Sequence, residues 1–141
     1  MADDFRLEVR SDPRFLRCIR NLVRGWAEAA DAAQDTADEM VLAVDEACSN
    51  AIRHSYGGQC DRFVELTLRA DENFLEVRLC DQGDPCPPEH RERRDLEAPD
   101  PERLEPGGLG VQLMHRAFDE VVFCSNNDRG NCIIMRRRRK Q

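Results

Sequence analysis

Two polar side chains have the types and the spacing to handle a metal ion and a proton. Glu46 and Asn50 lie four residues apart in a segment whose hydrophobic residues recur at helical spacing. Side chains four apart on a helix share one face. Asn is a poor helix former, so its place in mid-helix invites a functional reason. A carboxylate beside an amide oxygen could act as a general base next to a magnesium ion; the alternative is an ordinary solvated face.

A second candidate is the run Asp81-Gln82-Gly83, which follows a strand-like alternation of hydrophobic and polar residues. A carboxylate at the end of a strand can point into a cleft and accept hydrogen bonds there, for instance from an exocyclic amine. The glycine would let a flat ring approach the backbone. The alternative is a simple turn.

A third candidate is Gly107-Gly108-Leu109-Gly110, at the start of a predicted helix. Free backbone N–H groups at a helix N-terminus, with glycine flexibility, can cradle a phosphate. The Gly-Lys-Ser/Thr of a Walker motif is absent, and no strand directly precedes the glycines, so neither a P-loop nor a Rossmann site is supported. The alternative is a glycine-rich loop end.

The order of these three motifs resembles the GHKL (Bergerat-fold) ATPases. Residues 44–56 resemble the N box of that superfamily, residues 81–83 its G1 box and residues 108–110 its G2 box. Residues 107–122, and the opening strand followed by Ser11-Asp12-Pro13, are similar to the free-standing anti-sigma-factor serine/threonine kinases. The resemblance covers nearly the whole chain. It implies a histidine-kinase-like ATPase domain that binds ATP and Mg²⁺.

The resemblance also implies a role for each motif. Glu46 would be the general base, taking a proton from a serine hydroxyl or positioning a water. Asn50 would hold the Mg²⁺ that bridges the ATP phosphates. Asp81 would bind the adenine amine, and Gly83 would leave room for the base. The remaining nucleotide-binding residues implied are Arg53, Pro85, Gly107, Gly108, Leu109, Gly110 and Asn131, and residues 86–106 would form the ATP lid.

The sequence departs from the superfamily pattern at two places. Pro85 stands where many members carry a second glycine of the G1 box. Near the last strand, Gly130-Asn131 replaces a Gly-Thr whose hydroxyl supports an adenine-binding water. The amide of Asn131 would have to take over that role.

The predicted elements follow the order β-α-α-β-β-loop-α-β-β. Alternating or apolar runs predict strands, and hydrophobic residues at helical spacing predict helices. The strands fall at residues 4–10, 64–69, 75–80, 121–124 and 132–135, and the helices at about 13–30, 36–55 and 111–118. Helices grouped beside antiparallel strands predict an α+β fold, a two-layer sandwich. With the resemblance, we expect a mixed, mostly antiparallel sheet.

Composition narrows the class of protein. The 141 residues suit one domain, with 40% hydrophobic residues and a net charge of −7. We expect no membrane span, because no window approaches the roughly 18–20 apolar residues required. The acidic start of the chain predicts no signal peptide. The negative charge argues against direct nucleic-acid binding. We interpret the basic tail at residues 136–141 as a charged strand end and a solubilising terminus; the alternative is a contact with nucleic acid.

The seven cysteines show no CxxC pair, and several lie inside apolar patterns. We expect reduced, mostly buried thiols of a cytoplasmic protein, and no zinc site.

The resemblance therefore implies a single ATP-binding kinase domain over residues 1–141. It would phosphorylate a serine of an anti-sigma-factor antagonist and sequester a sigma factor, and the resemblance implies a homodimer through the first strand and helix. The alternative is a non-catalytic module in which ATP only shapes a partner-binding surface. The catalytic half of a sensor histidine kinase ranks third, because no helical hairpin with a phosphoacceptor histidine precedes the first strand.

Overall fold

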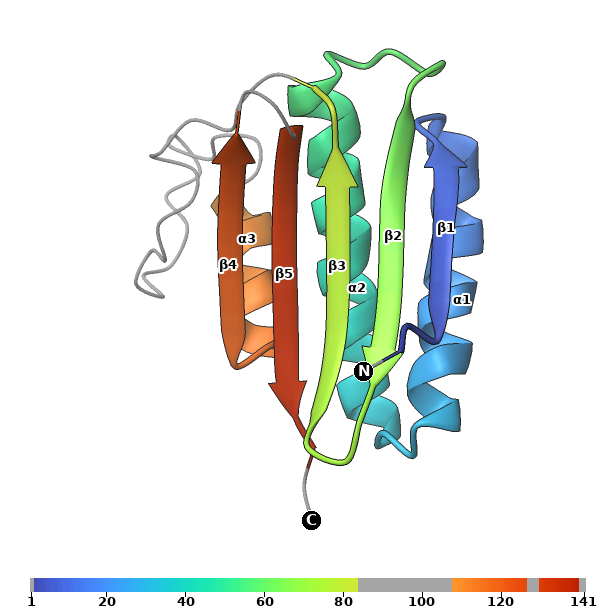
Figure 1. Cartoon of the computed structure of the whole chain (residues 1–141), viewed down its shortest axis with the longest axis vertical. Helices are drawn as coiled ribbons and strands as arrows, with labels where there is room; N and C mark the ends of the chain where they lie inside the picture. Colours follow the sequence, from blue (N-terminus) through green and yellow to red (C-terminus); the bar gives the residue numbers. More distant parts are fainter. Residues whose placement is uncertain (1, 84–107, 127–129, 140–141) are drawn as a thin grey trace.

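A single five-stranded sheet and the helices on one of its faces make up the fold (Figure 1). The computed structural model describes residues 2–83, 108–126 and 130–139. The sheet order is β1-β2-β3-β5-β4. Its strands are β1 Phe5–Arg10, β2 Phe63–Ala70, β3 Phe74–Asp81, β4 Glu120–Asn126 and β5 Gly130–Arg138. The α-helices are α1 Leu16–Ala29, α2 Gln34–Asn50 and α3 Gly108–Ala117. The prediction of an α+β two-layer sandwich is confirmed.

The expectation of a mixed sheet is wrong for the described strands. All four of their pairings are antiparallel. The reason is the position of β5, which enters the sheet between β3 and β4. β3 and β4 are therefore not neighbours, and every adjacent pair runs in opposite directions.

The core lies between the sheet and the helices, and the hydrophobic periodicity of the sequence supplies it. Alternate residues of β2 and β3 are buried, as are the apolar stripes of α1 and α2. Fully buried large side chains include Val23, Met40, Val44, Leu66, Leu68, Val77, Leu79, Met114 and Met135. Burial of this apolar surface is the main force that holds the helical layer on the sheet.

The second helix ends in an unusual way. After Asn50 the chain continues as a π-helical turn, Ala51–Ser55. Gly57 and Gly58 then adopt φ of 58° and 82°, the left-handed conformation in which glycine commonly ends a helix. Turns of π-helix are frequent at functional sites. Among the described residues, no helix combines the length and the apolar character needed to cross a lipid bilayer.

The expectation of reduced, mostly buried cysteines is wrong. Cys80 and Cys132 form a disulfide, with Cα atoms 4.1 Å apart. Of the free cysteines in the described part of the chain, Cys48 is buried, whereas Cys18, Cys60 and Cys124 are exposed. The disulfide depends on β5 lying beside β3, a pairing that no local sequence pattern reveals.

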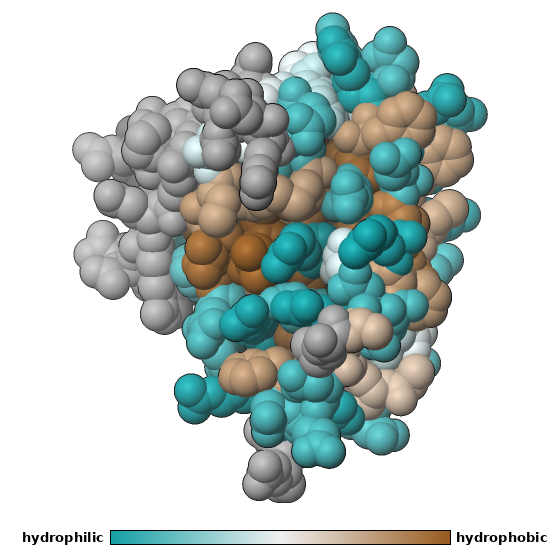
Figure 2. All heavy atoms as spheres, in the orientation of Figure 1, coloured by the Kyte–Doolittle hydropathy of each residue, from teal (hydrophilic) through white to brown (hydrophobic). Residues whose placement is uncertain are grey.

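Figure 2 shows hydrophobic surface on the open face of the sheet, where β4 and β5 lie.

The last strand is longer than predicted, running to Arg138 instead of ending at Met135. The prediction of a charged strand end is thus correct. Two arginines of this segment, however, form hydrogen bonds to the ends of helices. Arg137 donates to the carbonyl of Ala117, the last residue of α3, at 2.8 Å. Arg139 donates to the carbonyl of Ala30, just after α1, at 2.7 Å. Cations at helix C-termini offset the negative end of the helix dipole.

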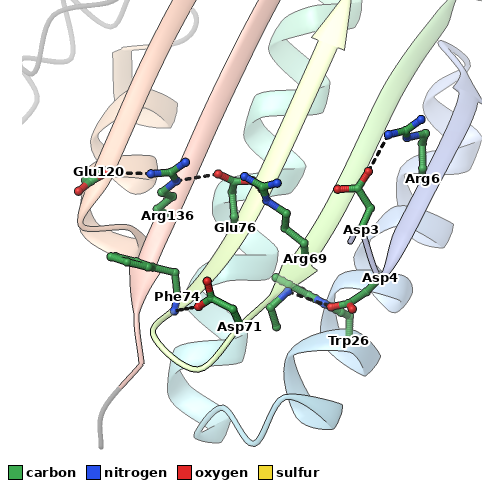
Figure 3. A network of polar contacts seen from close by, with 11 residues as sticks. Asp3, Asp4, Arg6, Trp26, Arg69, Asp71, Phe74, Glu76, Glu120 and Arg136 are labelled. Atoms are coloured by element: carbon green, nitrogen blue, oxygen red, sulfur yellow. Dashed lines mark hydrogen bonds and ion pairs between the residues drawn. The ribbon is translucent and has the colours of Figure 1, made fainter. Parts of the chain in front are cut away.

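A buried carboxylate lies on the open face of the sheet (Figure 3). Glu76 of β3 is only 2% exposed. It forms ion pairs with Arg69 of β2 and with Arg136 of β5, the latter at 2.6 Å. Burial would raise the pKa of Glu76, but the hydrogen bonds and charges of the two arginines outweigh it and hold this pKa below its usual value. The network joins three neighbouring strands.

Candidate nucleotide-binding and catalytic site

The carboxylate and the amide of the first motif lie together at the end of α2. Glu46 and Asn50 are both half-buried on one face of this helix. Arg53, in the π-helical turn, donates to Asn50 Oδ1 at 3.1 Å, and its guanidinium lies 3.7 Å from Glu46 Oε2. This places an acceptor for a proton, an oxygen of the type that Mg²⁺ prefers and a cation side by side.

The third motif packs against the first. A Cβ added to Gly110 would lie 2.9 Å from Glu46 Oε2 and 3.3 Å from Asn50 Nδ2. Glycine at this position therefore lets the first turn of α3 approach the polar face of α2. The backbone N–H groups of that first turn lack intrahelical partners and favour anions. The fold thus brings a helix N-terminus, of the kind that favours anions, to the candidate base and metal ligand, which lie about sixty residues away in the chain.

Gly110→Ala should lower catalysis by moving Glu46 while leaving the stability of the fold unchanged. The new methyl group would displace the Glu46 carboxylate, and misplacement on this scale lowers catalysis about ten- to hundredfold. Stability should not fall, because Ala is the better helix former by roughly 0.5–1 kcal/mol. Gly25→Ala in α1 is the matched control, since nothing lies within 4 Å of its Cβ position. The rate of the catalysed reaction and the thermal melting temperature are measured for both variants. A wild-type rate in Gly110→Ala would contradict the expected displacement of Glu46.

The second motif forms a hydrogen-bonded group at the end of β3. Asp81 is 6% exposed, and its Oδ1 accepts from the Gly83 N–H at 2.9 Å and from Asn131 Nδ2 at 3.0 Å. Burial raises the pKa of Asp81, opposed by the hydrogen bonds from Asn131, Gly83 and Ser55. Asn131 is the residue that departs from the superfamily's Gly-Thr, and its amide contacts Asp81 directly.

Gly83 also lies where a side chain could not fit. A Cβ there would come within 2.2 Å of the Ser55 carbonyl oxygen, at the end of the π-helical turn. Ser55, which belongs to the segment 44–56 that contains the first motif, is therefore in contact with Gly83 of the second motif. Tyr56, the next residue, reinforces this contact: its hydroxyl donates to the Phe63 carbonyl at 2.5 Å and accepts from the Gln82 N–H at 2.8 Å.

Sequence reasoning missed three residues of this group: Ser55, Tyr56 and Ser125. Ser125 donates to Asn131 Oδ1 at 2.8 Å, and Ser125, Asn131 and Asp81 lie opposite one another on β4, β5 and β3. Ser55 and Tyr56 lie within residues 44–56, which resemble the N box, but their hydroxyls were assigned no role there. Ser125 gave no signal, because its position depends on the strand order.

The remaining predicted site residues are described only in part. Pro85, Gly107 and the predicted lid at residues 86–106 lie outside the described residues. Gly108 and Leu109 begin α3.

The residues present fit ATP with Mg²⁺. In the described part of the chain, no group of three or more His, Cys, Asp or Glu side chains could hold a metal. Mg²⁺ in phosphoryl-transfer enzymes is usually held by one or two side chains together with substrate phosphates, so a full protein cage is not needed. Asn50 and the neighbouring Glu46 supply oxygens of the required kind.

Comparisons with known proteins place the chain among related sequences. Residues 9–137 match the model of the histidine kinase-like ATPase domain. The chain is 30% identical over 130 residues to the serine-protein kinase RsbW of Bacillus velezensis, covering 89% of this chain and 81% of that protein. It is 32% identical over 124 residues to RsbW of Bacillus subtilis, covering 85% and 77%.

A solved structure agrees with the fold. The structure of the RsbU and RsbW domains of Rv1364c from Mycobacterium tuberculosis matches with a TM-score of 0.60 and 17% identity, covering 96% of this chain and 33% of that one. The three juxtaposed motifs, the sandwich and these relatives agree, and the chain therefore belongs to the histidine kinase-like ATPase domain family, in the group of serine-protein kinases that includes RsbW.

Proposed function

We propose that this protein is an ATP-dependent protein-serine kinase that acts as an anti-sigma factor in the cytoplasm. Its phosphoacceptor is a serine of an antagonist protein, and its second partner is a sigma factor that it sequesters; we expect it to act as a homodimer. The observation that supports the proposal is the close approach of Gly110, in the first turn of α3, to Glu46 and Asn50. The relatives named serine-protein kinase support the same reaction.

Phosphoryl transfer needs positioning, charge neutralisation and one proton acceptor. In this proposal the N-terminal turn of α3 binds the phosphates. Glu46 accepts the proton of the incoming serine hydroxyl, and Arg53 lies beside both Glu46 and Asn50 as a nearby positive charge. Mg²⁺, held by Asn50, would neutralise phosphate charge when bound. Asp81 and Gly83 bind the adenine at the other end of the π-helical turn.

Asp81→Asn should weaken the binding of ATP with Mg²⁺. An amide in place of the carboxylate loses one acceptor and sets an N–H₂ group against the amide of Asn131 or the adenine amine. Leaving a buried polar group unpaired costs about 1–3 kcal/mol, which is roughly a 5- to 150-fold rise in Kd. Titration calorimetry measures this rise.

Asp61→Asn is the matched control, because this exposed carboxylate undergoes the same chemical change away from the site. Thermal melting of both variants separates a loss of affinity from a loss of fold. Wild-type affinity in a folded Asp81→Asn variant would rule out the adenine role. Tight ATP binding without any phosphoryl transfer by the wild-type protein would instead favour the non-catalytic module.

A further inference from the structure

Three cysteines lie in one row across neighbouring strands, on the face of the sheet that the helices leave open. Cys132 of β5 is directly opposite Cys80 of β3 on one side and Cys124 of β4 on the other. Residues directly opposite each other in an antiparallel sheet point to the same face. Cys80 and Cys132 are bonded, and Cys124 is free and exposed. We call these three residues the cysteine row.

The backbone geometry lets Cys132 bond either neighbour. Its Cα lies 4.1 Å from that of Cys80, the close spacing of a pair without backbone hydrogen bonds. The N–H and C=O of Cys132 then point toward β4, so its pair with Cys124 is the hydrogen-bonded type, with Cα atoms about 5.5 Å apart. That spacing is within the usual disulfide range of about 4.4–6.8 Å, whereas the 4.1 Å spacing of the bonded Cys80–Cys132 pair is just below it.

Cys80 and Cys124 cannot bond each other in this sheet. They lie two strands apart, which corresponds to roughly 9.5 Å, whereas cysteines whose Cα atoms are more than about 7 Å apart cannot be bridged without backbone movement. Cys48 takes no part: it is buried in the core, and burial raises the pKa of its thiol to about 12. Cys132 is therefore the sulfur that two partners share.

We propose that the cysteine row is a thiol–disulfide exchange site whose co-substrates are small thiols and small disulfides of the glutathione type. In the internal step, the Cys124 thiolate attacks Cys132 Sγ, the Cys124–Cys132 bond forms, and the Cys80–Cys132 bond breaks. The electron pair leaves on the Cys80 sulfur, which takes up a proton, so the step involves no net oxidation. The thiolate is the attacking form, and the exposure of Cys124 makes it accessible.

Exchange with small molecules changes the oxidation state of the row. A small thiol attacks the disulfide and forms a mixed disulfide with one cysteine, while the other leaves as a thiolate. A second small thiol then attacks the mixed disulfide, releases the second cysteine and departs as a small disulfide. Two electrons pass to the protein, and the reverse sequence with a small disulfide restores the bond.

The row lies directly behind the adenine-binding candidates. Cys80 precedes Asp81 and Cys132 follows Asn131, so the residues opposite one another on the helix-covered face are Asp81, Asn131 and Ser125. The Asp81–Asn131 hydrogen bond, 3.0 Å long, spans the same two strands that the disulfide ties. Moving or opening the disulfide removes the covalent link between β3 and β5 beside that contact, while the strand pairing itself remains. This coupling to ATP rests on the proposed function.

Disulfide mapping tests the exchange site without reference to ATP. The protein is oxidised with glutathione disulfide, its free thiols are alkylated in acid, and its peptides are identified by mass spectrometry. We expect Cys80–Cys132 in the wild type and Cys124–Cys132 in Cys80→Ser. Cys132→Ser should give no bond between Cys80 and Cys124. Cys18→Ser, which removes an exposed thiol on α1, is the control and should keep the wild-type pattern.

Two outcomes would overturn the exchange site: unbonded Cys124 and Cys132 in oxidised Cys80→Ser, or a Cys80–Cys124 bond in Cys132→Ser. A further arm uses the oxidised wild type at mildly alkaline pH without added thiol. A fraction of Cys80 should there become open to alkylation while the same fraction of Cys124 becomes protected, and Cys124→Ser should keep Cys80 fully protected. A Cys80 that remains protected in the wild type would also overturn the proposal.

Calorimetry with ATP and Mg²⁺ tests the coupling. Reduction of the wild type with dithiothreitol should weaken ATP binding about fivefold or more. The control is the double variant that carries both Cys80→Ser and Cys124→Ser. It holds no disulfide in the cysteine row, so reduction should not change its affinity for ATP. Equal affinity of the oxidised and reduced wild type would overturn the coupling. Absence of ATP binding in both states would contradict the proposed function, while the disulfide map would still decide the exchange site.

Discussion

Glu46→Gln should leave ATP binding intact and lower phosphoryl transfer to the antagonist protein by about 10²- to 10⁴-fold, the usual contribution of a positioned general base. The amide keeps the shape of the side chain and its packing against Gly110, but it does not accept a proton at neutral pH. Transfer of the labelled γ-phosphate measures the chemical step, and calorimetry with ATP and Mg²⁺ measures binding.

Two other substitutions sharpen this result. Glu28→Gln is the control, because it makes the same change at an exposed position on α1. Asn50→Ala removes the candidate metal ligand and should lose Mg²⁺-dependent ATP binding as well as transfer. Phosphorylation at the wild-type rate by Glu46→Gln would show that another group accepts the proton.

Glu76→Gln should destabilise the fold by about 3 kcal/mol, the lower end of the range for removing one partner from a buried ion pair. The lower end applies because the side chains of Arg69 and Arg136 are 22% and 40% exposed, while that of Glu76 is 3% exposed. The variant leaves both arginines without their shared carboxylate on the open face (Figure 3). Urea denaturation followed by circular dichroism measures the free energy of unfolding.

The pH dependence of this difference gives a second check. The pKa of Glu76 is lower in the folded protein than in the unfolded chain, where it is about 4.3. Its stabilising contribution is therefore complete above that pH and disappears as the pH falls through the lowered, folded-state pKa. The stability gap to Glu76→Gln should be constant near neutral pH and shrink in acid.

Glu72→Gln, at an exposed position in the turn between β2 and β3, is the control and should show no gap at any pH. A gap between the wild type and Glu76→Gln that persists unchanged to pH values well below 4 would mean that the charge of Glu76 is not what stabilises the three strands.

Short-range features of this protein were accessible from its sequence alone. Hydrophobic residues that recur with periods of 3.6 and 2 residues indicated which side chains share a helix face or a strand face. Glu46 and Asn50 were therefore correctly predicted to lie on one face of a helix. The positive φ of Gly57 and Gly58 also has a local cause, because glycine adopts positive φ without strain. The resemblance of three motifs in order then identified the family.

Only the tertiary structure decided which strand lies opposite which. Periodicity assigns a residue to a face, but it carries no information on the neighbouring strand, which long-range packing selects. The insertion of β5 between β3 and β4 therefore determined the contact of Asn131 with Asp81, the place of Ser125 and the cysteine row. Likewise, the approach of Gly110 to Glu46 depends on the packing of α3 on α2, which lie far apart in the chain and meet only because both cover one face of the sheet.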